Sequence, residues 1–473
     1  MLKIAASTVN EILRLHEFNT SASEIAKLLN IKKMQVTAII AHHAMKSLSP
    51  TVQSPLRVDE VSASDLERAE STIKDSTADE VATEPILDTE IQDSAESEGI
   101  LIGTDSEYND LMYWTPEDTQ DVPNPHMMIM GESGSGKTYS VQCLTAELAQ
   151  QDIPSIIFDY GQGFETQELD ETYRSYTKPK EYLLGEDGIP LNPLRIFPAD
   201  AHGPKSVATR LSDVFDAVYA LGPIQRRVLI DAILLSFERA GISSENRNTW
   251  EKQPPSIETL QTVLEDLSGD KSYPNAKNAV GLAARLTTFF MLASFSKDET
   301  GWSWDRLLGD HDHRIHILQF RGLEGKTQRV LVEVLLWHLF FFLKSKGQSQ
   351  LRMYCILDEA HHLSFRDGGP INTLLREGRK FGLGIMFASQ QPEDFSEAAY
   401  ANSASKLVFQ TADPNLKVSK FLASKCKNYD SPNEIHETIA VLPKGEALFM
   451  TRNRGHKVKV MDIQRRATFW GAK

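Results

Sequence analysis

The sequence predicts an α/β fold in which a parallel β-sheet carries the functional residues. From residue 99 onward, short apolar runs typical of buried strands alternate with helical patterns. A glycine-rich loop at 131–138 lies between the apolar run 127–130 and a helical pattern, which is where parallel sheets bind their ligands. Between 203 and about 300 the pattern is helical only and indicates an inserted lobe. The expected strands are 127–130, 155–158, 314–319, 353–357, 384–388, 407–410 and 447–450.

Residues 1–50 predict a separate small helical module. Ser21 and Glu24 form a capping box, Ala26 permits close helix crossing, and Asn30 tolerates the left-handed turn. The pattern resembles a helix-turn-helix, although Asn30 stands where glycine is more usual. Small units of this kind bind either DNA or protein partners, and both alternatives stay open. If the second helix enters a major groove, the contact candidates are Lys32, Lys33, Gln35 and Thr37.

An acidic linker is expected over residues 51–98. Residues 51–100 contain 14 Asp and Glu against 3 Lys and Arg, a net charge of −11 out of −15 for the whole chain. The stretch has few aromatic residues and no apolar periodicity, so it cannot bury enough surface to offset the entropy of ordering. The negative charge is therefore largely a property of the linker, and it does not exclude nucleic acid as a partner of the domain at 99–473.

The overall composition indicates a globular protein of the cytoplasm. With 473 residues, 41% hydrophobic and 24% charged, the chain can build a large core. The strongest apolar stretch, 330–343, is too short to span a bilayer, and the N-terminus lacks a cleavable apolar segment, so we expect no membrane association. Cys143, Cys355 and Cys426 are too few and too scattered for a disulfide framework or a zinc cluster, which fits a reducing compartment.

The loop at 131–138 matches the full pattern of a phosphate-binding loop. Its residues are Gly131, Glu132, Ser133, Gly134, Ser135, Gly136, Lys137 and Thr138. The glycines let the backbone wrap a phosphate, Lys137 reaches the β and γ phosphates, and the Thr138 hydroxyl ligates Mg²⁺. The alternative, a plain glycine-rich turn, is disfavoured by the flanking strand and helix. We therefore expect the chain to bind ATP with Mg²⁺ and to hydrolyse it.

A second motif supplies carboxylates for hydrolysis. The largely apolar residues 353–357 fit a buried parallel strand, and Asp358 and Glu359 follow at its carboxyl end. Asp358 would hold a metal-bound water, and Glu359 would take the proton from the attacking water. Apolar runs that end in acids are common, so an ordinary capped turn is the alternative for this segment alone. Beside a complete phosphate-binding loop, Glu359 is the candidate general base.

A third segment, 374–390, ends in the polar residue Gln390 at the carboxyl end of an expected strand. It is accompanied by Asn-Pro-His at 124–126, Asp-Glu-Ala-His at 358–361 and Gly-Glu-Ala at 445–447. With this combination of motifs, the chain resembles the HerA/FtsK superfamily of ATPases and is closest to HerA-like DNA translocases.

The resemblance covers roughly residues 100–463 and implies a RecA-like P-loop core. Members form rings, usually hexamers, that move along duplex DNA, and we expect sequence-tolerant contacts to its backbone. HerA-like members often work with a nuclease in end processing or phage defence, and a link to phosphorothioate-dependent restriction or another defence system is our subfamily expectation. The alternative function is a nucleotide-dependent switch that recruits or gates a partner nuclease with little processive movement.

The resemblance also implies residue roles. Gln390 would sense the γ-phosphate, and Arg379 would be an arginine finger inserted into the site of a second protomer, with Arg376 as the competing candidate. The alternative for both arginines is a solvated helix end. His361 would couple nucleotide state to a neighbouring segment. The chain departs from the family in lacking the usual N-terminal β-barrel and in having Gln391 where an arginine is usual.

Overall fold

The computed structural model describes residues 99–470, apart from 121, 162, 190, 296–302, 324 and 453, together with Ile25. The expected helix-turn-helix, its four contact candidates and the acidic linker therefore lie outside the described residues, except for Ile25. Residues 95–473 form one compact unit, and the fold below is that of this unit.

One 11-stranded sheet runs through the unit, in the order β2-β1-β11-β10-β9-β3-β8-β7-β4-β6-β5. The strands are β1 Ile100–Asp105, β2 Leu111–Trp114, β3 Met127–Met130, β4 Ser155–Asp159, β5 Lys180–Leu183, β6 Ile315–Gln319, β7 Ser349–Leu357, β8 Phe381–Ser389, β9 Ser405–Phe409, β10 Glu446–Met450 and β11 Gly455–Val460. The segment from β9 to β5 is parallel throughout, as the sequence predicts.

The expectation of a purely parallel sheet is wrong at one edge. Strands β10, β11, β1 and β2 are all antiparallel to their neighbours. Only residues 451–454 join β10 to β11, and only 106–110 join β1 to β2. A parallel crossover needs a dozen or more residues, so connections this short produce hairpins. The sheet is therefore mixed, with a parallel body and an antiparallel extension.

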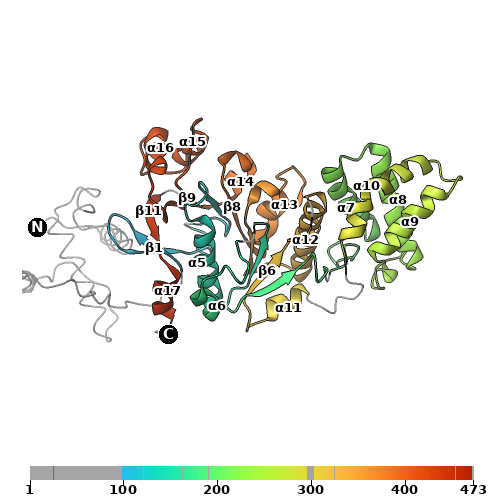
Figure 1. Ribbon diagram of the computed structural model, residues 1–473, viewed down its shortest axis with the longest axis horizontal. Helices are drawn as coiled ribbons and strands as arrows, with labels where there is room; N and C mark the ends of the chain where they lie inside the picture. The colour runs from blue at the N-terminus through green and yellow to red at the C-terminus, as the bar shows by residue number, and fades with distance from the viewer. Residues whose placement is uncertain are drawn as a thin grey trace, which may run out of the picture. The chain divides into compact units, whose positions relative to one another are not determined.

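Helices cover both faces of the sheet (Figure 1). The α-helices are α5 Lys137–Gln150, α6 Glu171–Thr177, α7 Pro204–Tyr219, α8 Pro223–Arg239, α9 Ile257–Gly269, α10 Ala276–Leu292, α11 Trp304–Gly309, α12 Gly325–Lys346, α13 Pro370–Glu377, α14 Glu397–Asn402, α15 Lys417–Ala423, α16 Pro432–Ala440 and α17 Ile463–Trp470. Short 3₁₀ turns are η2 Arg247–Thr249, η3 Ala360–His362, η4 Gly378–Lys380 and η5 Pro392–Asp394. Among the described residues, no helix combines the length and apolar character needed to cross a lipid bilayer.

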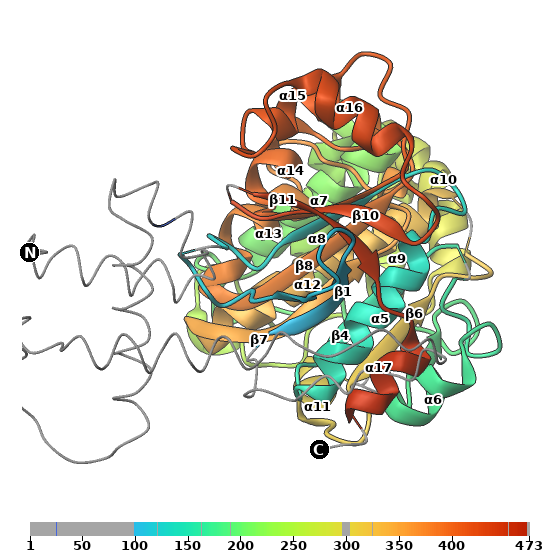
Figure 2. The ribbon, with the colours of Figure 1, turned by 90° about the vertical axis from the view of Figure 1, so that its left-hand side faces the viewer.

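Two hydrophobic cores, one on each face, explain why the central strands read as continuous apolar runs. In β3, Met128 and Met130 point into one core, while Met127 and Ile129 point into the other. The second core also takes the buried faces of α5, α6 and α17, which lie together in Figure 2. Because successive side chains of a strand alternate between faces, burial of both faces requires an apolar residue at every position.

The segment expected to be helical contains α7, α8, α9 and α10, at the right of Figure 1. These helices share the first hydrophobic core with the sheet rather than forming a core of their own. Within this lobe, Phe215 of α7 meets Phe289 of α10 edge to face, with ring centroids 4.9 Å apart. The lobe is therefore packed continuously onto the sheet domain.

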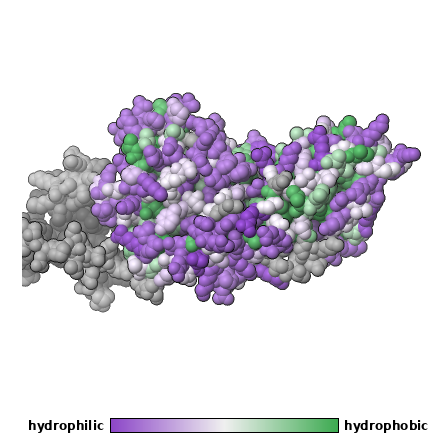
Figure 3. All heavy atoms as spheres, viewed as in Figure 1, coloured by the Kyte–Doolittle hydropathy of each residue, from purple (hydrophilic) through white to green (hydrophobic). Residues whose placement is uncertain are grey.

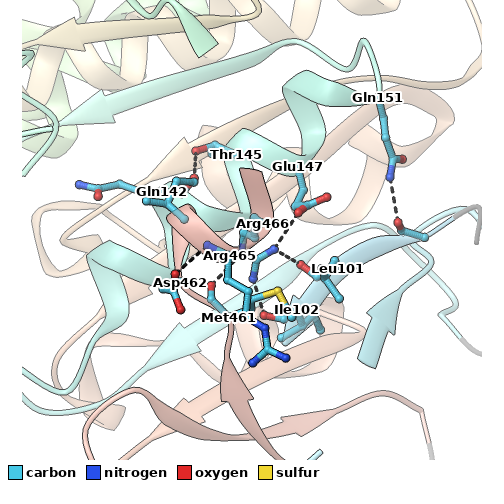
Figure 4. Close-up of polar contacts among 12 residues, drawn as sticks. Leu101, Ile102, Gln142, Thr145, Glu147, Gln151, Met461, Asp462, Arg465 and Arg466 are labelled. Carbon is cyan, nitrogen blue, oxygen red and sulfur yellow. Dashed lines mark hydrogen bonds and ion pairs between the residues drawn. The ribbon is translucent and has the colours of Figure 1, made fainter. Parts of the chain in front are cut away.

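A fully buried arginine ties the C-terminal helix α17 to the helix that follows the phosphate-binding loop (Figure 4). The guanidinium of Arg466 forms an ion pair with Glu147 of α5 at 3.1 Å and donates to the Met461 carbonyl at 2.8 Å. It also donates to the carbonyls of Leu101 and Ile102 in β1. A single side chain thus joins the first strand, the last helix and α5.

Candidate nucleotide-binding site

The phosphate-binding loop connects β3 to α5 and is held on both sides by neighbouring segments. Gly136, with φ 116°, and Gly131, with φ 156°, adopt backbone conformations that L side chains rarely reach. A Cβ on Gly131 would lie 2.5 Å from that of Phe409. The N–H of Glu132 donates to the Gln410 carbonyl at 2.8 Å, and the N–H of Gly445 donates to the Ser135 carbonyl at 3.0 Å. The loop is therefore held by Gln410, which follows the carboxyl end of β9, and by Gly445, which directly precedes β10.

Lys137 begins α5 and folds back over the loop. Its Nζ donates to the Glu132 carbonyl at 2.9 Å. Burial lowers the pKa of this ammonium, and the nearby charges of Glu359 and Asp358 act in the opposite direction. Lys137 lies at the N-terminus of a 14-residue helix, where free backbone N–H groups also attract anions. The ammonium and these N–H groups therefore favour the same negatively charged ligand.

Asp358 and Thr138 bring a carboxylate and a hydroxyl oxygen together at the end of the loop. Asp358 follows β7, and its Oδ2 accepts from Thr138 Oγ1 at 3.3 Å. The aspartate is only 4% exposed, and burial together with the charge of Glu359 raises its pKa to about 6. Carboxylate and hydroxyl oxygens are ligands that Mg²⁺ prefers, and a cation there would offset the cost of a buried carboxylate. The residues present therefore fit a magnesium site.

Glu359 is held in a strained backbone conformation with its carboxylate fixed by two neighbours. It has φ 53° and ψ 55°, which is costly for a residue with a side chain. Gln390, directly after β8, donates from Nε2 to the two carboxylate oxygens at 3.2 and 3.4 Å. His361 Nδ1 lies 3.1 Å from Oε2. These contacts hold the Glu359 carboxylate at a defined place beside Asp358.

His361 belongs to a stack of rings that leads away from Glu359. Its ring lies 4.2 Å from that of His362, which stacks on Tyr160 at 5.4 Å. Both histidines also line a cavity of about 260 Å³ together with Arg329 of α12 and Val218 of α7. His362 thus connects Tyr160, which directly follows β4, to His361, the residue that lies beside Glu359.

The turn after β4 lies beside Thr138 and Asp358. Asp159 organises this turn by accepting from the N–H groups of Gly161 at 3.1 Å and Phe164 at 2.9 Å, and from Gln319 Nε2 at 2.8 Å. A Cβ on Gly163 would lie 2.9 Å from Thr138 Cγ2. The glycine therefore lets the turn approach Thr138 closely, and the Asp-x-Gly-x-Gly pattern after a buried strand is the sequence signal for such a turn.

Arg376 and Arg379 lie apart from these groups within one chain. Both are exposed; Arg379 donates to the Pro123 carbonyl at 2.6 Å, and Arg376 pairs with Asp367 at 3.5 Å. They precede β8, whereas the phosphate-binding loop follows β3, which runs parallel to β8. The nine residues of β8 separate the two edges by roughly 26 Å at a rise of about 3.3 Å per residue. Neither arginine can reach the loop of its own subunit.

Comparison with protein families and curated proteins gives consistent matches. Residues 118–339 match the family described as the central domain of the helicase HerA. The DNA double-strand break repair helicase HerA of Sulfurisphaera tokodaii is 22% identical over 342 residues, which cover 69% of this chain and 62% of that protein. The corresponding HerA of Saccharolobus solfataricus is 22% identical, over 69% of this chain and 61% of that protein. The chain thus spans about three fifths of the length of these relatives.

Solved structures share the fold. VirB4 of Thermoanaerobacter pseudethanolicus superposes with a TM-score of 0.61 at 16% identity, over 78% of this chain and 97% of that one. The bacterial conjugative coupling protein TrwB gives a TM-score of 0.51 at 14% identity, over 77% of this chain and 89% of that one. These likenesses show the fold alone, an α/β core with helices on both faces of a parallel-dominated sheet.

Proposed function

Because the chain is a P-loop ATPase of the HerA/FtsK type, we propose that it uses the hydrolysis of ATP with Mg²⁺ to move along duplex DNA. The observation that carries the proposal is the meeting of four groups from three strand ends at one edge of the sheet. The groups are Lys137 after β3, Asp358 and Glu359 after β7, and Gln390 after β8. This combination binds a triphosphate and also holds a carboxylate for its cleavage.

The chain's own residues suit each part of hydrolysis. Lys137 would bind the β and γ phosphates, and Thr138 with Asp358 would hold a magnesium ion, which would supply positive charge to neutralise the phosphates. Glu359 orients a water and accepts its proton while the water oxygen bonds to the γ phosphorus and the bond to the β–γ bridging oxygen breaks. Gln390 keeps the Glu359 carboxylate in place and senses the γ-phosphate. ADP and phosphate are then released.

We further propose that the site is completed by an arginine from a second subunit in a homo-oligomeric ring, with six subunits favoured. Arg379 is the first candidate and Arg376 the second, since both are exposed at the amino edge of β8. Head-to-tail contacts that place this edge against the next subunit's loop close into a ring. A guanidinium is suited to the role because its donors match the spreading phosphate charge.

The DNA contact is proposed to be sequence-tolerant and made through phosphates. The HerA relatives are named as DNA double-strand break repair helicases, which supports DNA as the partner and permits a cooperating nuclease in repair or antiviral defence. The N-terminal helix-turn-helix, with Lys32, Lys33, Gln35 and Thr37, would add a DNA or protein contact. We place this activity in the cytoplasm, where thiols such as the three buried free cysteines stay reduced.

The decisive experiment compares wild-type protein with Glu359→Gln and with the control Glu168→Gln, which alters an exposed acid. The Glu359 variant should still bind ATP but lose turnover by about 100-fold or more, whereas the control keeps turnover. Wild-type hydrolysis should rise with duplex length, and the protein should displace the third strand of a triplex. If the rate of ATP hydrolysis does not depend on duplex length and the third strand is not displaced, the nucleotide-dependent switch is favoured over the motor.

A further inference from the structure

Positive charge is concentrated in one part of this acidic protein. Residues 415–460 contain nine Lys and Arg against four Asp and Glu, a net charge of +5, while the whole chain has −15. The nine cations are Lys417, Lys420, Lys425, Lys427, Lys444, Arg452, Arg454, Lys457 and Lys459. They lie on α15, on the connection from α15 to α16, before β10, and on the β10–β11 hairpin.

The fold brings two separate parts of this segment together. Asn428, between α15 and α16, accepts from the N–H of Gly455 at 2.9 Å and donates to the Gly455 carbonyl at 2.7 Å. A Cβ on Gly455 would lie 3.1 Å from Cys426 Sγ, so the hairpin approaches closely. Lys425 and Lys427 flank the buried Cys426, and Arg454 precedes Gly455. We call Lys425, Lys427, Arg452 and Arg454 the basic surface.

The cations of the basic surface are exposed, and Arg452 donates to the Gln120 carbonyl at 3.3 Å. None of the four side chains forms an ion pair with an acid in the part of the chain that the structure describes. The helices beneath are anchored by buried apolar residues of α15 and α16, namely Val418, Leu422, Ile435 and Ile439. Cations that lie close together and are not paired with acids attract an anionic ligand from outside the protein.

The surface is also connected to the nucleotide site. Helices α15 and α16 follow the carboxyl end of β9 and stand out from the sheet in both ribbon views (Figures 1 and 2). The segment that leads into them begins at Gln410 and the one that leaves them reaches Gly445, and both residues bond to the phosphate-binding loop. The exposed face over these helices is mainly hydrophilic, whereas hydrophobic side chains gather over the helical lobe (Figure 3).

We propose that the basic surface binds the phosphate backbone of duplex DNA, an inference that rests on the proposed function and assigns its DNA contact. A chain with a net charge of −15 repels DNA as a whole, so attraction must come from a local excess of cations. Duplex DNA presents one charge per about 1.7 Å of axis, and Lys and Arg displace its counterions without reading bases. The contact is therefore sequence-tolerant, as a moving motor requires.

The test compares Lys425→Glu/Lys427→Glu with Lys271→Glu/Lys277→Glu, which makes the same change of charge at two exposed lysines of the helical lobe. Binding to two 30-base-pair duplexes of unrelated sequence is measured by fluorescence anisotropy at several salt concentrations. The basic-surface variant should bind both duplexes at least about 10-fold more weakly, and its log–log salt slope should fall by about 2. Its basal ATPase activity should stay at the wild-type level, and the lobe variant should bind within about twofold of wild type.

Three results would overturn the inference in distinguishable ways. If wild-type protein binds duplex DNA and Lys425→Glu/Lys427→Glu binds equally well, the surface is not the DNA contact, and the proposed function stands. If a peptide of residues 51–98 binds wild type but not this variant, while DNA affinity is equal in both, the surface is a docking site for an acidic protein segment. If wild-type protein neither binds duplex DNA nor is stimulated by it, the proposed function fails as well.

Discussion

Replacement of Asp358 by asparagine should stabilise the nucleotide-free protein while it removes ATPase activity. The aspartate is 4% exposed at the end of β7, and burial raises its pKa from an ordinary 3.8 to about 6. Asparagine has the same shape and carries no charge to bury. Its Oδ1 can still accept from the N–H of Glu359, which bonds to Asp358 Oδ1 at 3.0 Å. The exchange therefore removes a destabilising charge with little loss of contact.

The magnitude and the pH range follow from the raised pKa. At 1.36 kcal/mol per pH unit, a rise from 3.8 to about 6 corresponds to about 3 kcal/mol. Below pH about 4, Asp358 is protonated in both the folded and the unfolded wild type. Wild type and Asp358→Asn should then be equally stable. Between pH about 4 and 6 the unfolded wild type loses its proton first, so its stability falls relative to the variant. Above pH about 6 the variant should be more stable by about 2–3 kcal/mol.

Urea unfolding in metal-free buffer at pH 4.5 and pH 8 measures this difference. Addition of ATP and Mg²⁺ at 100 times their dissociation constant should stabilise wild type by about 2.7 kcal/mol, because only the folded state binds. The variant lacks the carboxylate for the metal and should gain less, so at pH 8 its advantage over wild type should shrink, at most by about 2.7 kcal/mol. Equal stabilities at pH 8, or a difference that does not change with pH, would refute the buried-charge argument.

Three further predictions concern other parts of the site and fold. Arg466→Met should lower the free energy of unfolding by roughly 3–5 kcal/mol in urea titrations, since it breaks the buried ion pair with Glu147 and removes the donor to the β1 carbonyls; a loss below about 1 kcal/mol would contradict this. His361→Ala should lower kcat by about 10-fold with KM unchanged, and His361→Asn, which keeps an N–H donor, should recover part of it; equal kcat values would exclude a role for the contact between His361 and Glu359. Mixed Arg379→Ala and Lys137→Ala subunits should regain ATPase activity, and failure at every ratio would exclude a shared site.

The parts of the site that are local in sequence could be predicted from it. The phosphate-binding loop needs glycines at φ values that other residues rarely adopt, and Lys137 follows at a fixed spacing, so the pattern encodes the geometry. Strand β3 could also be predicted, because Met128 and Ile129 face two different cores and both must be apolar. A strand that is buried on both faces is recognisable in the sequence as a short, continuous run of apolar residues.

The antiparallel edge could not be predicted in the same way. Strand β11 reads Gly-His-Lys-Val-Lys-Val, and its half-solvated face removes the apolar run that marks central strands. Strand β1 contains Gly103, which reads as a break in a strand. In the structure a Cβ on Gly103 would lie 1.9 Å from the Lys459 carbonyl, so the glycine is there because β11 passes close by. Gly103 is therefore required by contact with β11, which lies more than 300 residues away in the sequence.

The two arginines show how topology decides what local sequence leaves open. Arg376 and Arg379 follow a helix and precede a strand, a pattern equally suited to a solvated helix end and to a catalytic finger. Strand β8 runs parallel to β3, so residues before β8 and the loop after β3 necessarily lie at opposite edges of the sheet. A finger in the same subunit is therefore excluded by strand direction alone. On the proposed mechanism, hydrolysis then requires a neighbouring subunit, and assembly itself becomes a condition for turnover.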